Sequence, residues 1–246
     1  MPRHPPWVSR VHPLGGHSPR SVGQAIGQIL SLGVAVAISP VPIIGVVLML
    51  ATPRARANGP AFLVGWVGGL AVLGTVVLLV SSGADASSSG QPASWVSVLK
   101  LVLGALLLAV AVRQWRGRPR GDQPAKLPTW MEAIDRFNAL KALGMGVLLA
   151  TVNPKNGLMT IAAGAAIAQT GVGAGKAAVA LAIFIAIATV GVAVPVAIFF
   201  ILGDRSARLL GDMREWMGAH NAAIMAVLLL VIGAKLIGDG ISGLAS

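Results

Sequence analysis

The sequence predicts an all-α, polytopic membrane protein with about six transmembrane helices, arranged as two inverted three-helix repeats. Three observations support this fold class. Of the 246 residues, 55% are hydrophobic and only 11% are charged, and the mean hydropathy is +0.80. Apolar runs of about 18 residues or more recur along most of the chain. Proline-containing breaks interrupt the first and the fourth of these runs at similar depths.

Six hydrophobic runs can each cross about 30 Å of hydrocarbon at 1.5 Å per residue, the third only just. They cover residues 23–50, 61–81, 95–112, 142–168, 177–202 and 221–243. Residues 1–22 are rich in proline, histidine and arginine without apolar periodicity, so we expect a disordered leader there.

Residues 23–246 are expected to form a single transmembrane domain. Within it, the first repeat covers about 23–112, a basic cytoplasmic loop about 113–141, and the second repeat about 142–246. The loop contains a T-x-x-E sequence at Thr129 and apolar residues Trp130, Ile134 and Phe137 at helical spacing. Either an interfacial helix or a solvated connector whose apolar residues contact neighbouring helix ends fits this pattern.

Basic residues between the runs predict the orientation. The segments after the first, third and fifth runs carry twelve lysines and arginines, whereas those after the second and fourth carry none until Lys176. The three arginines of the leader argue the other way but are outnumbered. The positive-inside rule therefore predicts a multi-pass protein of the plasma membrane with both termini outside.

Composition excludes several kinds of site. The chain has no cysteine, so it has no disulfide and no thiolate metal site. Three of its four histidines, His4, His12 and His17, lie in the leader, and His220 lies at the edge of a run. No phosphate-binding glycine loop is present. We therefore expect no cofactor, no metal, no nucleic acid partner and no enzymatic activity.

Two proline breaks mark the most informative positions. Ser39-Pro40-Val41-Pro42 lies near the middle of the first run, and Asn153-Pro154-Lys155-Asn156 lies at a similar depth in the fourth. Pro40 and Pro154 are 114 positions apart, and an odd number of spans per repeat inverts the second copy. Because proline removes a backbone donor, each break should free carbonyl groups in the membrane. The alternative is that each proline is an ordinary structural kink.

The candidate substrate-binding or helix-break residues are Ser39, Pro40, Pro42, Asn153, Pro154, Lys155 and Asn156. Lys155 is the leading candidate to bind an anionic group or to take part in coupling, although a lysine in a membrane can also snorkel to the interface. Lys235 and Asp239 have i, i+4 spacing, so an ion pair is favoured over a proton relay. Gly65 and Gly69 form a G-x-x-x-G pattern that predicts close helix packing.

Three segments carry a family resemblance: S-P-V-P-I-I from Ser39, T-P-R-A-R-A-N-G from Thr52, and N-P-K from Asn153. In these the chain resembles the GAP-like glycolipid-addressing proteins of actinobacteria, within the lysine exporter (LysE) superfamily. The resemblance covers all six runs. It implies a role in moving peptidoglycolipids or sulfolipids to the cell surface. Lysine exporters have proline-glycine-proline in the first span, whereas this chain has Pro40-Val41-Pro42, which argues against amino-acid specificity.

The first hypothesis is therefore an integral membrane transporter, or a transport accessory, for export of cell-envelope glycolipids. One alternative is an ion-coupled exporter of small amino acids or cations, which should carry paired buried acids. Another is a non-transporting membrane scaffold for a larger lipid exporter. Membrane lipids are the expected partners, and a larger lipid transporter and a second copy of the chain are further partners that these hypotheses allow.

Overall fold

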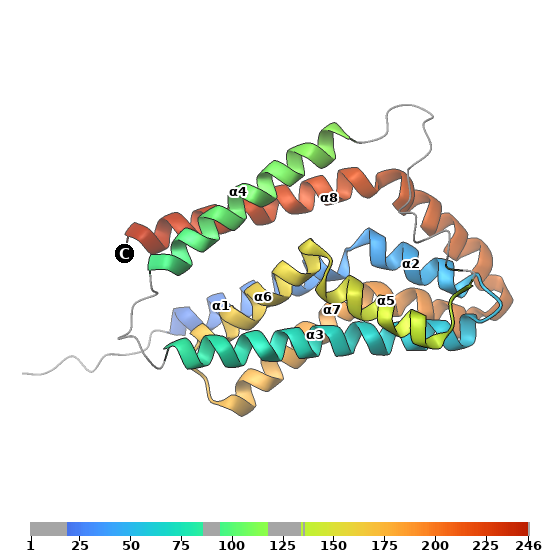
Figure 1. The fold of residues 1–246 in the computed structure, drawn as a ribbon, viewed down its shortest axis with the longest axis horizontal. Helices are drawn as coiled ribbons and strands as arrows, with labels where there is room; N and C mark the ends of the chain where they lie inside the picture. Colours follow the sequence, from blue (N-terminus) through green and yellow to red (C-terminus); the bar gives the residue numbers. More distant parts are fainter. Residues whose placement is uncertain (1–18, 86–93, 118–133, 135, 246) are drawn as a thin grey trace, which may run out of the picture.

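The computed structural model consists of helices in the part of the chain that it describes (Figure 1). The structure describes residues 19–85, 94–117, 134 and 136–245. In chain order its elements are α1 (Pro19–Ala37), α2 (Pro40–Leu50), α3 (Ala55–Asp85), α4 (Ser94–Arg116), α5 (Ala139–Thr151), α6 (Pro154–Gln169), α7 (Ala174–Leu202), the 3₁₀ helix η2 (Gly203–Arg205) and α8 (Ser206–Ala245). The predicted all-α class is confirmed for these residues.

The helices are longer than the apolar runs that predicted them. α1 begins at Pro19, so the last four residues of the predicted leader are helical, which fits the frequent use of proline as the first residue of a helix. Residues 1–18 lie outside the described part of the chain. α8 begins at Ser206, well before the sixth apolar run, which begins at residue 221. The additional turns at its start pack against α2.

Both predicted proline breaks divide their runs into two helices. α1 ends at Ala37 and α2 begins at Pro40, and the two axes differ by 44°. α5 ends at Thr151 and α6 begins at Pro154. In each case proline is the first residue of the second helix, where its missing N–H leaves no intrahelical bond unmade.

The helices form a bundle with a separate pair along one side (Figure 1). In the bundle, α3 packs against α5 and α6, and α7 packs against α1 and α2. α4 packs along α8, and α8 also contacts α2. Figure 1 shows the pair α4 and α8 lying above the layer that contains α1, α6 and α3. The α4–α8 pair is therefore joined to the bundle mainly through the part of α8 that contacts α2.

Glycines allow the close contact between α3 and α5. A Cβ atom added to Gly65 would overlap the backbone carbonyl of Leu143, and one added to Gly146 would overlap the carbonyl of Phe62. Next to this contact lies Gly69, whose added Cβ would stand 3.1 Å from the Cβ of Ala150. The close packing predicted from the G-x-x-x-G pattern is therefore present, with backbone against backbone.

Two stretches of the described residues are long and apolar enough to cross a membrane, Ala55–Ser82 and Ala174–Leu244. The bent pair Ile29–Ala37 and Pro40–Leu50 raises this number to up to three. The second stretch has 71 residues and contains both α7 and α8, which run in opposite directions in Figure 1. α5 is apolar but has only 13 residues, because the break at Asn153 shortens it. By length and composition the described helices thus indicate a membrane protein.

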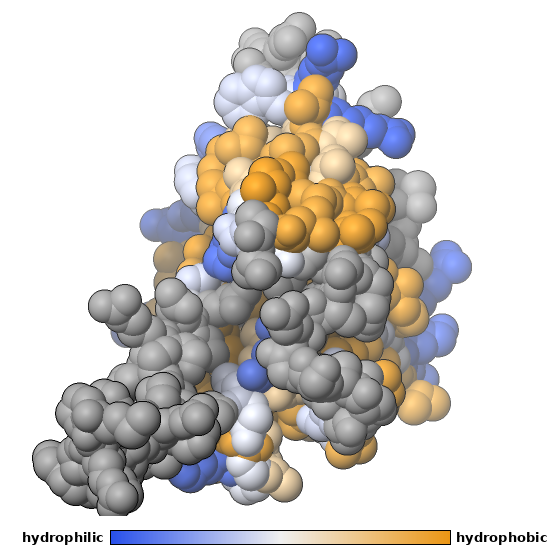
Figure 2. Space-filling model, turned by 90° about the vertical axis from the view of Figure 1, so that its left-hand side faces the viewer, coloured by the Kyte–Doolittle hydropathy of each residue, from blue (hydrophilic) through white to orange (hydrophobic). Residues whose placement is uncertain are grey.

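Many large apolar side chains are exposed on the surface of the described helices, as in proteins that face lipid. Exposed valines and leucines recur along one face of α4, at Val98, Val102 and Leu106. Figure 2 looks at the end where α8 finishes, and its upper part, which corresponds to α4 and α8, is mostly hydrophobic. The largest buried side chains, Trp66 and Phe62, come from α3 inside the bundle.

The amphipathic stretch predicted in the basic loop lies largely outside the described residues. Two of its apolar members are described, and both belong to the core: Ile134 and Phe137 are buried, and the Phe137 N–H donates to the Ile134 carbonyl. For these two residues the contact with neighbouring helices, which was one of the two interpretations of the pattern, is the one observed.

Candidate functional site at the two helix breaks

The first break frees a carbonyl group inside the bundle. In a continuous helix the Ile38 carbonyl would accept from the N–H four residues later, and that residue is Pro42, which has none. Ser39, between the helices, is extended at φ −102° and ψ 105°, is buried, and makes no side-chain cap to α2. The break therefore leaves both the Ile38 carbonyl and the Ser39 hydroxyl available to other partners.

The second break is held by its own asparagines. Asn153 caps α6, because its Oδ1 accepts from the Lys155 N–H at 3.1 Å. The Asn156 side chain donates from Nδ2 to the Leu149 carbonyl at 3.0 Å, which replaces a bond that the interrupted α5 can no longer make. Thr160 Oγ1 donates to the Asn156 carbonyl at 2.9 Å and secures the start of α6. Asn153 and Asn156 thus stabilise the break from both sides.

Lys155 joins the two breaks. Its side chain is only 2% exposed, and its Nζ donates to the Ile38 carbonyl at 3.4 Å. The lysine of the second break therefore meets the carbonyl that Pro42 frees in the first. Within the described residues no carboxylate lies within 4.0 Å of this ammonium group. An ammonium group has three donors, so Lys155 retains donors for an anionic group.

Two residues of the helix breaks carry unpartnered polar atoms. Ser39 Oγ and Asn156 Oδ1 are buried and have no hydrogen-bond partner among the described residues. The same is true, away from the breaks, of Trp66 Nε1 and Asn58 Oδ1 on α3 and of Asn221 Oδ1 on α8. Buried polar groups are normally hydrogen-bonded, so the unpaired atoms of Ser39 and Asn156 are available to a ligand or an ordered water. The seven candidate residues thus come from two breaks, of which Ser39, Lys155 and Asn156 are the buried polar members.

The glycines at the breaks permit a close approach of backbone to backbone. A Cβ on Gly191 of α7 would overlap the Ala37 carbonyl, and a Cβ on Gly157 would overlap the Thr151 carbonyl. Ala37 and Thr151 are the last residues of α1 and α5. Each break is therefore packed against a glycine through the residue that ends its first helix.

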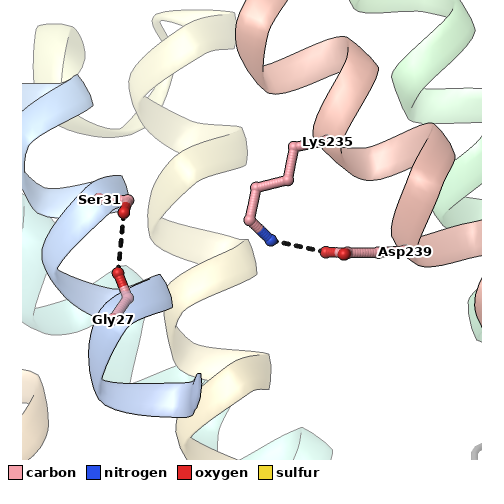
Figure 3. A network of polar contacts seen from close by, with 4 residues as sticks. All are labelled: Gly27, Ser31, Lys235 and Asp239. Atoms are coloured by element: carbon pink, nitrogen blue, oxygen red, sulfur yellow. Dashed lines mark hydrogen bonds and ion pairs between the residues drawn. The ribbon is translucent and has the colours of Figure 1, made fainter. Parts of the chain in front are cut away.

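Lys235 and Asp239 form a separate site on α8. Lys235 Nζ lies 2.7 Å from Asp239 Oδ2, and both side chains are partly exposed, at 44% and 34% (Figure 3). The pair points away from α4, toward the side on which α6 and α1 lie. On α1, the Ser31 hydroxyl donates to the Gly27 carbonyl of the same helix. The ion pair expected from the i, i+4 spacing is present, and it does not belong to the helix breaks.

Asn58 is a buried residue whose individual role the sequence did not indicate. It is fully buried at the start of α3, and its Nδ2 donates to the Phe137 carbonyl at 3.2 Å. In the same segment, Thr52 Oγ1 donates to the Met49 carbonyl at 2.8 Å and closes the end of α2. The T-P-R-A-R-A-N-G segment marks this region in the sequence, but the partner of Asn58 lies 79 positions away, whereas that of Thr52 is local. The segment links the end of α2 to the start of α5.

The part of the chain that the structure describes has no group of three or more histidine or acidic side chains able to hold a metal ion. The arrangement at the breaks offers hydrogen-bond donors and one cationic group instead. Its chemistry suits recognition of an anionic or polyhydroxylated group.

Comparison with known proteins supplies the family. No curated protein and no solved structure shows significant similarity to this chain. A family model described as SfLAP, "Sap, sulfolipid-1-addressing protein", matches residues 29–242, which includes both helix breaks and the ion pair of α8. Since this match covers most of the 246 residues, the chain belongs to the sulfolipid-1-addressing protein family, which agrees with the glycolipid-addressing resemblance of its motifs.

Proposed function

We propose that the chain is an integral membrane transporter, or a transport accessory, that exports cell-envelope glycolipids to the surface. The central site lies at the two helix breaks, and Lys155 addresses an anionic part of the lipid head group. The observation that carries this proposal is the hydrogen bond from Lys155 Nζ to the Ile38 carbonyl. It brings the cation of one broken helix to the free carbonyl of the other, which is the layout that secondary transporters use for substrate.

The proposed architecture has six spans in two inverted repeats. Ser39 and Asn153 are both N-caps followed by proline, and they are 114 positions apart. The packing is reciprocal: α3 contacts the broken pair α5 and α6, and α7 contacts the broken pair α1 and α2. In Figure 1 the corresponding helices of the two halves run in opposite directions. These features support a pseudo-two-fold axis in the membrane plane.

The proposed orientation places both termini outside. The connection from α2 to α3, which holds Arg54, and the bend from α7 to α8, which holds Arg205, lie at one end of the bundle, opposite the end at which α8 finishes (Figure 1). Arg56 and Arg208 belong to the first turns of the helices that follow. The start of α1 and the end of α8 lie together at that opposite end. This clustering supports a cytoplasmic position for the arginine-bearing end.

Access to the proposed site requires movement. Lys155, Ser39 and Asn156 are all buried, so a head group reaches them only when the half-helices separate. The breaks supply natural hinges, because the chain between α1 and α2 and between α5 and α6 is not held by a continuous helical ladder. The lipid chains would remain in the bilayer while the head group passes through the bundle.

The buried polar side chains favour a lipid over a coupled cation as the cargo. They are Ser39, Thr52, Asn58, Lys155, Asn156, Thr160 and Ser206 among the described residues, and none is acidic. A cation exporter is expected to carry buried carboxylates along its pathway. The basic character of the site instead fits an anionic group. We further propose that membrane lipids are the main partners and that the chain is not an enzyme.

Deleting the gene and profiling the lipids inside and at the surface of the cell tests the function. We expect one class of envelope glycolipid to disappear from the surface and to accumulate inside. Restoring the gene should reverse the defect, whereas restoring it with Lys155→Ala should not. An unchanged surface lipid profile, with altered release of small amino acids or cations, would refute the lipid proposal and support the ion-coupled alternative.

A further inference from the structure

A cavity lies at the end of α2 that is away from the helix breaks. It has a volume of about 440 Å³ and lies between the last turn of α2, the end of α7 and the first turns of α8. At 1.5 Å per residue, the 11 residues of α2 separate it from the break by about 16 Å. Figure 1 shows this end of α2 beside the bend from α7 to α8.

The cavity is amphipathic. Val47 and Leu50 of α2, Phe199 of α7 and Leu210 of α8 give it apolar walls. Arg214 lines it as well, on the same face of α8 as Leu210, which is four residues earlier. No carboxylate of the described residues lies within 4.0 Å of the Arg214 guanidinium group, so this cation is free to meet a ligand.

One acidic side chain also lines the cavity. Asp204 belongs to η2, directly before α8, and its carboxylate is stabilised by the positive end of the α8 helix dipole. Asp204 and Arg214 are the two charged residues that line the cavity, and they do not form an ion pair with each other. The Arg214 guanidinium group therefore keeps its donors for an anion.

We propose that this cavity binds an anionic amphiphile, with a phosphate or sulfate ester at Arg214 and an acyl chain against the apolar wall of α2, α7 and α8. Arginine binds such oxyanions through two parallel N–H donors, and the apolar wall adds affinity only for an anion that carries a chain. The site is separate from the helix breaks and does not depend on the proposed transport activity.

Two glycines of α8 allow a test that preserves folding. Gly211 lines the cavity, and a Cβ added there meets nothing within 4 Å, so Gly211→Leu should fill the cavity without a backbone clash. Gly218 lies two turns further along α8, is equally unobstructed, and does not line the cavity. Both substitutions replace a helical glycine with a better helix former, so neither should impair folding.

Native mass spectrometry of the purified full-length protein in detergent can count bound lipids. We expect phosphatidylglycerol to bind more tightly than phosphatidylcholine. Arg214→Gln should weaken phosphatidylglycerol binding about tenfold, as expected for the loss of a hydrogen bond to a charged group. Arg208→Gln, which changes an arginine of the same helix outside the cavity, should leave binding unchanged. Asp204→Asn should strengthen binding a few-fold by removing a like charge, roughly as for an exposed pair.

The variants also distinguish the competing outcomes. Gly211→Leu should abolish the bound lipid and Gly218→Leu should retain it. Equal binding of the two lipids, equal effects of Arg208→Gln and Arg214→Gln, or weaker binding in Asp204→Asn would overturn the proposal. Displacement of the lipid by millimolar glycerol phosphate alone would show that the cavity recognises a free anion and would overturn the amphiphile assignment. None of these results depends on export by the protein.

Discussion

Replacing Lys155 with methionine should separate transport from folding. Methionine keeps most of the length of the side chain and much of its apolar contact but removes the ammonium group. Lys155 is 2% exposed, and among the described residues its Nζ has one acceptor, the Ile38 carbonyl. We therefore expect export to fall while the protein remains folded and reaches the membrane in normal amounts.

The expected magnitudes follow from that single contact. At 3.4 Å the bond to Ile38 is at the outer limit of a hydrogen bond, and even a good one contributes only about 0.5–1.5 kcal/mol. Removing an ammonium group from water costs several kcal/mol. Lys155→Met should therefore leave the free energy of unfolding unchanged or raise it by about 1–4 kcal/mol. Loss of a charged contact to the head group, worth about 1.5–3 kcal/mol, should lower export about 10- to 100-fold.

The assay measures the surface-extractable fraction of the envelope lipid in cells that lack the native gene and carry each variant. Membrane abundance and thermal unfolding of the purified variants provide the normalisation. Lys235→Met is the matched control, because Lys235 is 44% exposed in an i, i+4 pair that contributes about 0.3–0.5 kcal/mol. Lys155→Arg separates charge from shape: retained export indicates a general electrostatic role, and lost export indicates a tight pocket.

Normal export by Lys155→Met at normal abundance would refute the central-site assignment and make Lys155 a structural residue. A marked loss of stability, with export reduced only in proportion to folded protein, would refute it equally.

Two further predictions concern the bundle and its orientation. Gly65→Ala should destabilise the protein by about 1–3 kcal/mol in thermal unfolding, because the new Cβ overlaps the Leu143 carbonyl. Gly68→Ala, on the same helix, is the control: its new Cβ meets nothing within 4 Å, so it should be neutral or mildly stabilising. Equal effects of the two substitutions would contradict the α3–α5 packing. The chain has no cysteine, so single introduced cysteines can report the orientation. With both termini outside, Ala57→Cys should resist an impermeant thiol reagent in intact cells, and Ala174→Cys should react with it. The reverse pattern would exclude this orientation.

Features that depend on local sequence were predictable. Proline lacks a donor wherever it occurs, so the breaks at Pro40 and Pro154 could be placed without knowledge of the tertiary structure. The same holds for Lys235 and Asp239, because i, i+4 spacing brings side chains together on any helix. The glycine spacing likewise indicated which face of α3 packs closely against another helix, although it did not indicate that this helix is α5.

Features that depend on packing between distant segments were not predictable. Lys155 and Ile38 are 117 positions apart, and Asn58 and Phe137 are 79 apart, so neither contact follows from local spacing. The cavity beside Arg214 exists only because the bend from α7 to α8 returns to the end of α2. Hydropathy also placed the start of the last helix too late, because it registers apolar length and not the packing of the preceding turns against α2.

Leaflet exchange of a labelled lipid by the purified protein tests most directly whether the helix breaks form a path for a head group. The full chain is reconstituted into liposomes that contain a fluorescent sulfated glycolipid, and dithionite, which reaches only the outer leaflet, reports the exchange. We predict that the wild-type protein makes all of the label accessible within minutes, that Lys235→Met does the same, and that Lys155→Met leaves the inner half protected. Protection of half the label with wild-type protein at verified incorporation would contradict transport by the chain itself and leave it an accessory or a scaffold.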